Sequence, residues 1–458
     1  MINCSMQSKN IKPLLAIMSI GFFLGILNIF SPGFLFILFM ILLIILKISL
    51  ISDPQERTFL TRIFILGVIA RIFLVLLIQF VLISQQKWTY YEGGDRAITF
   101  FGDDGFNNVV GWWIAQYISG KQLSDYLLLA ASSSIGEYGR TSYLYIVSLF
   151  HYLFGYSPIS VIFLNCIVGA LTGIVYYFIA KKITDVKTAK ISAILVTFFP
   201  SLIIWSIINL KDPLFIFLTG IILLLFLQLL DNFKIKYLIL LILCLILQYS
   251  LRNWVLLITP LILVFAYLVI KKKLKITHII LSLIILIIAS PLFKNKLDDL
   301  KSRTVSYHLG VFSSGGSTYR LYDDWVYQHG ASSAKVPYFE VVKGSLRGWV
   351  HFFLEPFPWK MLSKLSLVCF PQMLIWYCLT PFSLIGILTQ LRYNWNKSLV
   401  LVIYFFIIGS FFSLTGGNIG TDFRMRDVLT PLMLLFSSIG LVKTFYIKPN
   451  TPKVKNNL

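Results

Sequence analysis

The chain has 458 residues, of which 57% are hydrophobic and 13% are charged. Apolar runs of 18 or more residues recur along it, and each is long enough to cross a bilayer. This composition excludes an assembly of soluble domains and predicts an all-α, polytopic membrane protein with about 12 transmembrane helices. The formal net charge of +21 does not indicate a nucleic-acid partner, because its distribution follows membrane topology.

The predicted spans are separated mostly by short turns. In chain order they are 11–30, 32–51, 60–84, 158–180, 187–206, 213–230, 236–251, 253–270, 276–293, 365–390, 397–415 and 427–446. With both termini in the cytoplasm, the cytoplasmic side holds 21 basic and four acidic residues, and the outer side holds 18 basic and 15 acidic residues. Cytoplasmic loops carry such an excess of Lys and Arg, so the sequence predicts this orientation.

Two long outer segments interrupt the series of spans. The first, at 85–157, contains helical patterns at 111–118 and 142–154. Because these are too short to be spans, we interpret both as helices lying on the outer surface. The second, at 294–364, is rich in Ser and Gly at 313–317, which favours a flexible section over a packed domain.

These patterns divide the chain into four parts. We expect residues 1–59 to form two N-terminal transmembrane helices, and residues 60–293 to form a transmembrane module that includes the first outer loop. Residues 294–364 are the second outer loop, and residues 365–458 are the C-terminal transmembrane helices with a basic cytoplasmic tail. Five scattered cysteines show no metal-ligand spacing, so we interpret them as small core residues.

An acidic pair, Asp103 and Asp104, follows the third predicted span in the stretch Phe-Phe-Gly-Asp-Asp-Gly. Carboxylates beside lipid are costly and commonly mark functional sites. Fifteen of the 19 carboxylates lie on the outer side, so the polar chemistry gathers at the outer mouth of the bundle. The alternative is a turn with solvated carboxylates, because Asp favours turns and Gly102 and Gly105 flank the pair.

Basic residues at outer span ends could bind a phosphate at headgroup depth. Lys211 and Arg252 lie at two short turns, and Arg424 and Arg426 lie at a third. Such cations would stabilise a departing lipid phosphate, while an outer carboxylate acts as general base on an acceptor hydroxyl. Asp212, next to Lys211, is also a candidate substrate- or phosphate-binding residue, although Lys-Asp-Pro matches a helix cap as well. The arginines could instead be interfacial side chains.

The order of these features resembles the GT-C superfamily of membrane glycosyltransferases, which includes protein O-mannosyltransferases and the lipid A aminoarabinose transferase. The resemblance covers about residues 60–255. Over residues 294–446 it is limited to the architecture, which is one large outer loop followed by the last spans. The matching stretches are Gly102 to Asn107, Ala115 to Gly120, Leu149 to Gly155, Tyr176 to Lys182, Phe199 to Leu202 and Trp205 to Pro213.

The resemblance implies that Asp103 is the candidate base with Asp104 as its neighbour, and that Asp212 is the acidic residue of the next outer turn. Two features depart from the family pattern. The chain has two extra N-terminal spans, and the family's aromatic residue after the acidic pair is only Phe106 or Asn107 here.

We therefore expect a glycosyltransferase in a bacterial inner membrane with its active site on the outer face. It would move a sugar, with inversion, from a polyprenyl-phosphate donor to a glycan, lipid or protein acceptor, in contact with membrane lipid. No cofactor follows from the sequence and no residue is predicted as a metal ligand, although the two aspartates could hold a divalent ion.

Two other functions stay open. An O-antigen or polysaccharide polymerase or ligase that uses undecaprenyl-diphosphate glycans would rely on outer-loop arginines and a histidine, here Arg320, Arg347 and His351. A lipid-glycan flippase or transporter would need polar residues or broken helices at the membrane midplane. Arg71 is the clear candidate, although we expect it to pair with a polar side chain inside the bundle.

Overall fold

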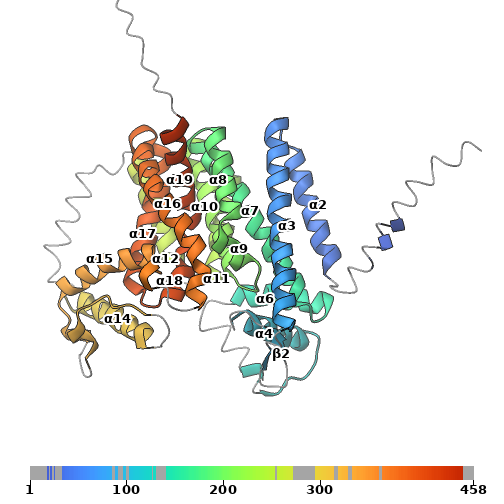
Figure 1. Cartoon of the computed structure of the whole chain (residues 1–458), viewed down its shortest axis with the longest axis horizontal. Helices are drawn as coiled ribbons and strands as arrows, with labels where there is room; N and C mark the ends of the chain where they lie inside the picture. Colours follow the sequence, from blue (N-terminus) through green and yellow to red (C-terminus); the bar gives the residue numbers. More distant parts are fainter. Residues whose placement is uncertain are drawn as a thin grey trace, which may run out of the picture. The chain divides into compact units, whose positions relative to one another are not determined.

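A computed structural model shows that the long elements of the chain are helices (Figure 1). The structure describes residues 18–19, 21–22, 25, 33–84, 88–90, 96–98, 103–125, 127–129, 141–252, 255–271, 294–313, 318–328, 333–360 and 364–446. A short antiparallel hairpin in the first outer loop, β1 (Trp88–Tyr90) and β2 (Arg96–Ile98), pairs Thr89 with Ala97. The predicted all-α class is confirmed, and the hairpin is a small addition to it.

Five helices in the described part of the chain are long and apolar enough to cross a membrane. They are α3 (Pro54–Ser84), α7 (Pro158–Ile183), α10 (Asp212–Asp231), α16 (Lys364–Tyr393) and α17 (Trp395–Thr415). Two bent pairs raise the total to seven if each is one span. These are α8 (Val186–Phe198) with α9 (Pro200–Ser206), and α18 (Ile419–Arg426) with α19 (Thr430–Tyr446). The protein is therefore a multi-pass membrane protein.

Three further predicted spans coincide with shorter apolar helices. These are α2 (Phe34–Ser49), α11 (Ile235–Leu251) and α12 (Val255–Ile270). The predicted span at 276–293 lies outside the described residues, and so does most of the one at 11–30. A total of twelve spans therefore stays a prediction.

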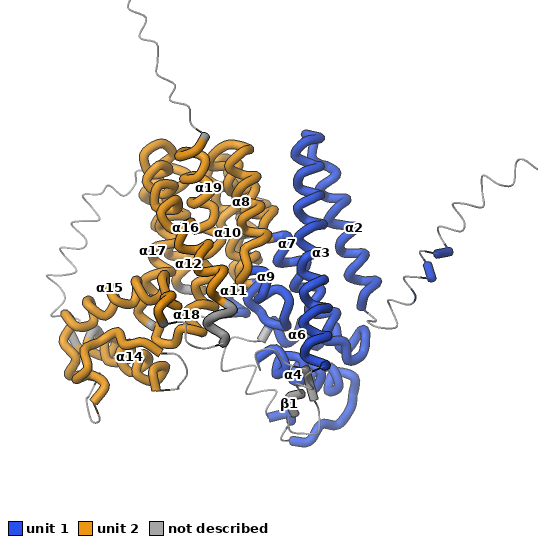
Figure 2. The backbone as a smooth tube through the Cα atoms, viewed as in Figure 1, with its two compact units in different colours: residues 1–171, 202–214, 249–253 blue, residues 172–201, 215–248, 254–458 orange. Residues whose placement is uncertain are grey.

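The chain forms two compact units, each built from segments far apart in sequence (Figure 2). Unit 1 comprises residues 1–171, 202–214 and 249–253. In it, α4 (Asp103–Ile118) packs against α6 (Thr141–Phe154), at the positions where we expected surface helices. Val109, Val110, Trp113 and Ile114 form the apolar face of α4, with the spacing of an amphipathic helix.

Unit 2 comprises residues 172–201, 215–248 and 254–458. In it, α16 packs against both α17 and α19 (Figure 1). A Cβ at Gly386 of α16 would lie 1.9 Å from the Phe436 carbonyl oxygen, and one at Gly440 of α19 would lie 2.0 Å from that of Phe382. Glycine at both positions lets the two backbones touch, as small residues do at interfaces between membrane helices.

The described residues of the second outer loop pack around a shared core, whereas residues 314–317, in the stretch for which a flexible section was predicted, lie outside the described residues. The loop contains α14 (Lys294–Ser313), η2 (Asp324–Tyr327), η3 (Ser333–Lys335), α15 (Tyr338–Leu354) and η4 (Pro358–Lys360). Their core consists of Val305, Tyr319, Leu321, Tyr322, Val326 and Val336. Four aliphatic side chains and two tyrosines supply this core.

Candidate functional site

The acidic pair forms the first turn of helix α4 in unit 1 and not an irregular turn. Carboxylates are favourable there because they face the positive end of the helix dipole. Asp103 is partly exposed, whereas Asp104 is buried at 6% exposure. Asn107 and Asn108 follow one turn later and are both buried. The start of α4 therefore presents two carboxylates and two amides on adjoining faces.

A short turn between α9 and α10 lies against this part of the molecule. Asn165, from α7, places Nδ2 3.0 Å from the Ile208 carbonyl oxygen and 2.9 Å from that of Leu210. Asn107 donates from Nδ2 to the Asn209 carbonyl oxygen at 2.9 Å. The carbonyl groups of the turn are thus held by amide side chains from α4 and α7.

Tyr143 of α6 joins these amides into one network. Its hydroxyl donates to Asn209 Oδ1 and accepts from Asn165 Nδ2 at 2.9 Å. Asn209 Nδ2 in turn donates to Asn108 Oδ1. Tyr143 is 2% exposed, so this phenol meets its hydrogen-bonding needs inside the protein.

The surroundings of Tyr143 connect two predicted site residues. Burial raises the pKa of Tyr143 well above its ordinary value, the bond from Asn165 opposes this, and the charges of Asp212 and Asp104 raise the pKa further. Both carboxylates therefore act electrostatically on the same phenol. Hydrogen bonds of Asn107 and Asn108 with Asn209 link α4, which carries Asp104, to the turn that precedes Asp212.

Asp212 begins α10 and forms a buried ion pair with Arg252. Arg252 Nη2 lies 2.7 Å from Asp212 Oδ1, and the two side chains are 9% and 4% exposed. The neighbouring Lys211 donates from Nζ to the Leu251 carbonyl oxygen at 3.0 Å, at the end of α11. The two predicted cations of unit 1 thus lie together at the junction of α10 and α11.

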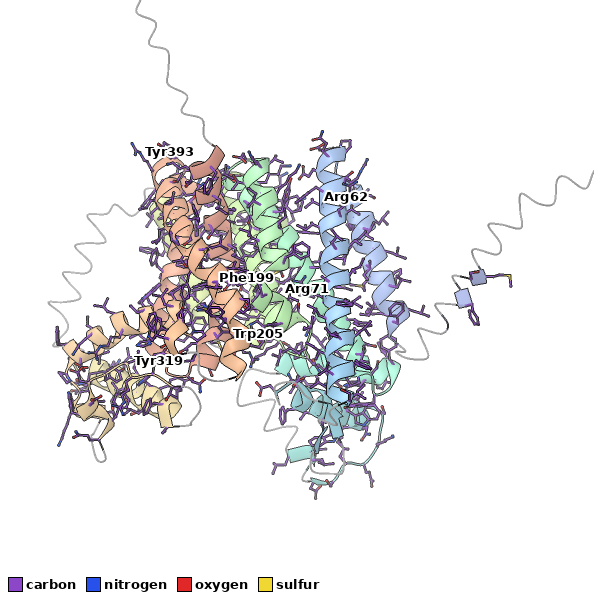
Figure 3. All side chains as sticks on the ribbon, in the orientation of Figure 1. Arg62, Arg71, Phe199, Trp205, Tyr319 and Tyr393 are labelled. Atoms are coloured by element: carbon purple, nitrogen blue, oxygen red, sulfur yellow. The ribbon has the colours of Figure 1, made fainter. Side chains whose placement is uncertain are left out.

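Arg71, whose partner the sequence left open, is fully buried on α3 (Figure 3). Its Nε donates to Ser206 Oγ at 2.8 Å and its Nη1 donates to the Gly67 carbonyl oxygen at 3.0 Å. A Cβ at Gly169 of α7 would lie 2.9 Å from Arg71 Nε, so glycine makes room for the guanidinium. Arg71 supports the end of α9, one residue before the turn.

The remaining predicted cations belong to unit 2. Arg426 is 1% exposed and donates from Nη1 to the carbonyl oxygens of Phe353 and Glu355, at 3.0 and 2.9 Å. Its guanidinium lies 4.5 Å from the centre of the Trp376 ring. Arg426 therefore binds the carbonyl end of α15 in this structure. Arg424 is partly exposed.

The two arginines of the polymerase alternative are held by carboxylates of their own loop. Arg320 pairs with Asp324 at 2.7 Å, and both side chains are more than half exposed. Arg347 donates to Asp323 at 2.9 Å and to the Leu321 carbonyl oxygen at 3.2 Å. Beside it, Lys343 reaches the same Asp323. These contacts stabilise the fold of the loop.

His351, the third residue of that alternative, lies in a polar cluster near the C-terminal end of α15. Its Nδ1 is 3.1 Å from Glu355 Oε1. Its ring stacks on that of Tyr319, with centroids 4.2 Å apart. Tyr319 donates to Asp422 at 2.5 Å. His351 is therefore part of the joint between α15 and α18.

Sequence reasoning did not single out the polar residues that organise the unit 1 site, namely Asn107, Asn108, Tyr143, Asn165 and Asn209. One signal was present, because Asn165 interrupts the apolar helix α7, and a buried amide needs partners. The identity of those partners depends on contacts between distant segments. Among the described residues, no group of three or more His, Cys, Asp or Glu side chains is arranged to hold a metal ion.

The comparisons with known proteins point in one direction. Residues 142–293 match a family model described as dolichyl-phosphate-mannose-protein mannosyltransferase. No curated protein matches the chain. The matched region includes Tyr143, Asn165, Asn209, Asp212 and Arg252, and it begins after the acidic pair of α4. The resemblance drawn from the order of sequence motifs is thereby confirmed for the central part of the chain.

Proposed function

We propose that this chain, as a membrane glycosyltransferase of the dolichyl-phosphate-mannose-protein mannosyltransferase family, a family of GT-C type, uses a polyprenyl-phosphate sugar donor. The reaction takes place at the outer face of a bacterial inner membrane, and both termini of the chain lie in the cytoplasm. The acceptor is a hydroxyl group of a glycan, lipid or protein. The sequence and structure support this class of acceptor through the carboxylates gathered in unit 1.

In the proposed reaction, a carboxylate of the acidic pair takes the proton of the acceptor hydroxyl. The hydroxyl oxygen attacks the anomeric carbon, the bond from that carbon to the lipid phosphate breaks, and the configuration inverts. Asp103 is the better placed base, because it is partly exposed and can reach an external hydroxyl. Asp104, the next residue, is buried, and its charge would influence the electrostatic environment of Asp103.

The departing lipid phosphate carries negative charge that cations must stabilise. Lys211 and Arg252, together with Asp212, form a charged cluster where α10 begins and α11 ends. Arg424, in unit 2, is partly exposed, and its predicted contact with a phosphate stays a prediction. The guanidinium of Arg426 binds main-chain carbonyl groups in this structure. Its contact with a phosphate stays a prediction.

One observation carries the proposal: a single buried network joins α4, one turn after the acidic pair, to the turn that leads into Lys211 and Asp212. A transferase needs a base and a leaving-group site at a fixed separation. A network with amides from two helices and a phenol from a third supplies such rigidity.

The test is sugar release by purified protein from a radiolabelled panel of polyprenyl-phosphate sugars. Loss of a general base costs about 10²- to 10⁴-fold in rate, so we expect Asp103→Asn to lose at least that much and Asp104→Asn to be impaired. Asp125→Asn is the matched control, because Asp125 is an exposed carboxylate of the same loop. Monodispersity in detergent establishes folding. Wild-type turnover by both Asp103→Asn and Asp104→Asn would exclude the acidic pair as the base.

The polymerase or ligase alternative makes the opposite prediction, namely that Arg320, Arg347 or His351 is essential and the acidic pair dispensable. Their contacts within the second outer loop favour structural roles. The transporter alternative relied on Arg71, which is bound to Ser206 and the Gly67 carbonyl group. Neither alternative gains support from these contacts.

A further inference from the structure

We infer that Tyr143, with Asn165 and Asn209, is a positioning residue for glycosyl transfer: this trio holds the acidic turn of α4 and the Lys211–Asp212 turn in one fixed arrangement. The inference rests on the proposed function and deepens it. None of the three residues is assigned a contact with the donor or the acceptor. They act through the carboxylates at either end of the network.

All three residues of the trio are buried. Tyr143 and Asn165 are each 2% exposed, and Asn209 is fully buried. Polar groups without water must find protein partners, and a network in which they do so is rigid. Here the donors and acceptors come from α6, α7 and the turn after α9. Removal of the Tyr143 hydroxyl takes away the hydrogen bond that it donates to Asn209 Oδ1.

The Tyr143 hydroxyl connects the side chains of Asn165 and Asn209. Tyr143 has one hydroxyl hydrogen, which it donates to Asn209, while its oxygen accepts from Asn165. Because burial raises its pKa far above the ordinary value, Tyr143 keeps its proton at working pH. It therefore acts by holding Asn209 in place and not by transferring a proton.

Asn108 and Asn209 connect the network to the helices that carry the reacting groups. Asn108 accepts from Asn209 and lies one helical turn after Asp104 in α4, a rise of about 6 Å. Asn209 also precedes Asp212 by three residues, at the start of α10. Fixing Asn209 therefore fixes both carboxylate-bearing helix starts relative to each other.

The test compares Tyr143→Phe with Tyr145→Phe on the same helix. Tyr145 is 49% exposed, so its variant controls for the loss of a hydroxyl from α6. A misplacement of about 1 Å can cost roughly 100-fold in rate. We expect Tyr143→Phe to lower kcat by roughly ten- to 100-fold with little change in the KM for the donor, and Tyr145→Phe to match wild type.

A second readout separates positioning from a merely structural role. In the Asp103→Asn protein, Tyr143→Phe should lower the residual rate no further, because residues that act as a unit are strongly non-additive. If Tyr143→Phe does not fold, Asn107→Ala serves instead, since it removes only the bond to the Asn209 carbonyl oxygen. It should lower kcat in the same direction.

The outcomes are distinguishable. If Asp103→Asn and Asp104→Asn keep full turnover, the proposed function itself fails. If those variants are inactive while folded Tyr143→Phe and Asn107→Ala keep wild-type kcat, the positioning role alone is overturned. If Tyr143→Phe lowers the rate by the same factor in the Asp103→Asn protein as in wild type, Tyr143 acts independently of the acidic pair. This result would also overturn the positioning role.

Discussion

At the scale of single residues, the ion pair between Asp212 and Arg252 is the most consequential contact that the sequence left ambiguous. Its two charges are almost fully buried, 2.7 Å apart. Taking both charges out of water costs several kcal/mol per ion, which their attraction offsets only while both partners are present. The pair therefore ties the start of α10 to the end of α11, whatever it contributes to catalysis.

This pair permits a test that separates stability from donor binding. Arg252→Met leaves Asp212 buried without its ion-pair partner, and should destabilise the folded protein by about 3–5 kcal/mol. Adding Asp212→Asn should restore most of this stability. If Arg252 also binds the lipid phosphate, the KM for the donor stays raised in the double variant, as measured by initial rates.

The matched control is Arg303→Met, because Arg303 pairs with Asp299 at the surface and is 77% exposed. It should change neither the unfolding temperature nor the KM, since exposed pairs contribute little. A double variant with a wild-type KM would leave Arg252 with a structural role alone.

At the scale of elements, His308 links α14 to the end of α17. Its Nδ1 is 2.6 Å from the Gly416 carbonyl oxygen, which only accepts, so Nδ1 carries the proton. Its Nε2 then accepts from the Tyr327 hydroxyl at 2.7 Å. The Tyr327 oxygen already accepts from two backbone amides, those of Leu321 and Tyr322. A second proton on His308 would break this chain of hydrogen bonds.

The docking of α14 should therefore depend on pH. Burial lowers the pKa of His308 below its usual value, so near pH 6 the folded protein binds fewer protons than the unfolded chain. Stability is then lost as pH falls below about 6.5, the ordinary pKa of His. His308→Gln keeps a donor for Gly416 and cannot titrate, so its unfolding temperature should fall less steeply between about pH 6.5 and pH 5. Equal slopes in the two proteins would exclude His308 as the responsible group.

Helix positions were largely predictable, because hydropathy and helical periodicity are local properties of the chain. The expected surface helix at 142–154 corresponds to α6, and the expected pattern at 111–118 is the C-terminal half of α4. The start of α4 at Asp103 was not predicted. Glycines beside two aspartates also suit a turn, and the packing of α4 on α6 decides between a turn and a helix.

At the scale of the whole molecule, the asymmetry of basic residues predicts which loops face the cytoplasm. In a background without reactive cysteines, Asp324→Cys should react with a membrane-impermeant maleimide in intact cells. Phe233→Cys should react only after permeabilisation. Both positions are well exposed, at 81% and 74%, so access to the reagent depends on the side of the membrane. The reverse labelling pattern would invert the proposed orientation and move the acidic pair to the cytoplasmic side.

The division of the chain into four consecutive parts also stays a prediction. The compact units combine distant segments, so that 202–214 and 249–253 belong with the first 171 residues. Such grouping follows from contacts across the fold, and a reading along the chain cannot supply it.

The sequence by itself determined that this protein is helical, crosses a membrane several times, and resembles GT-C glycosyltransferases, because these conclusions need only local hydropathy and the order of short motifs. It also pointed to Asp103, Asp104, Asp212 and Arg252. Only the tertiary structure decided that Asp212 pairs with Arg252, that Arg426 binds carbonyl groups of α15, and that Tyr143 connects Asn165 to Asn209. The physical reason is that buried polar groups take whatever partner the fold brings within about 3 Å, and distance along the chain does not determine that partner.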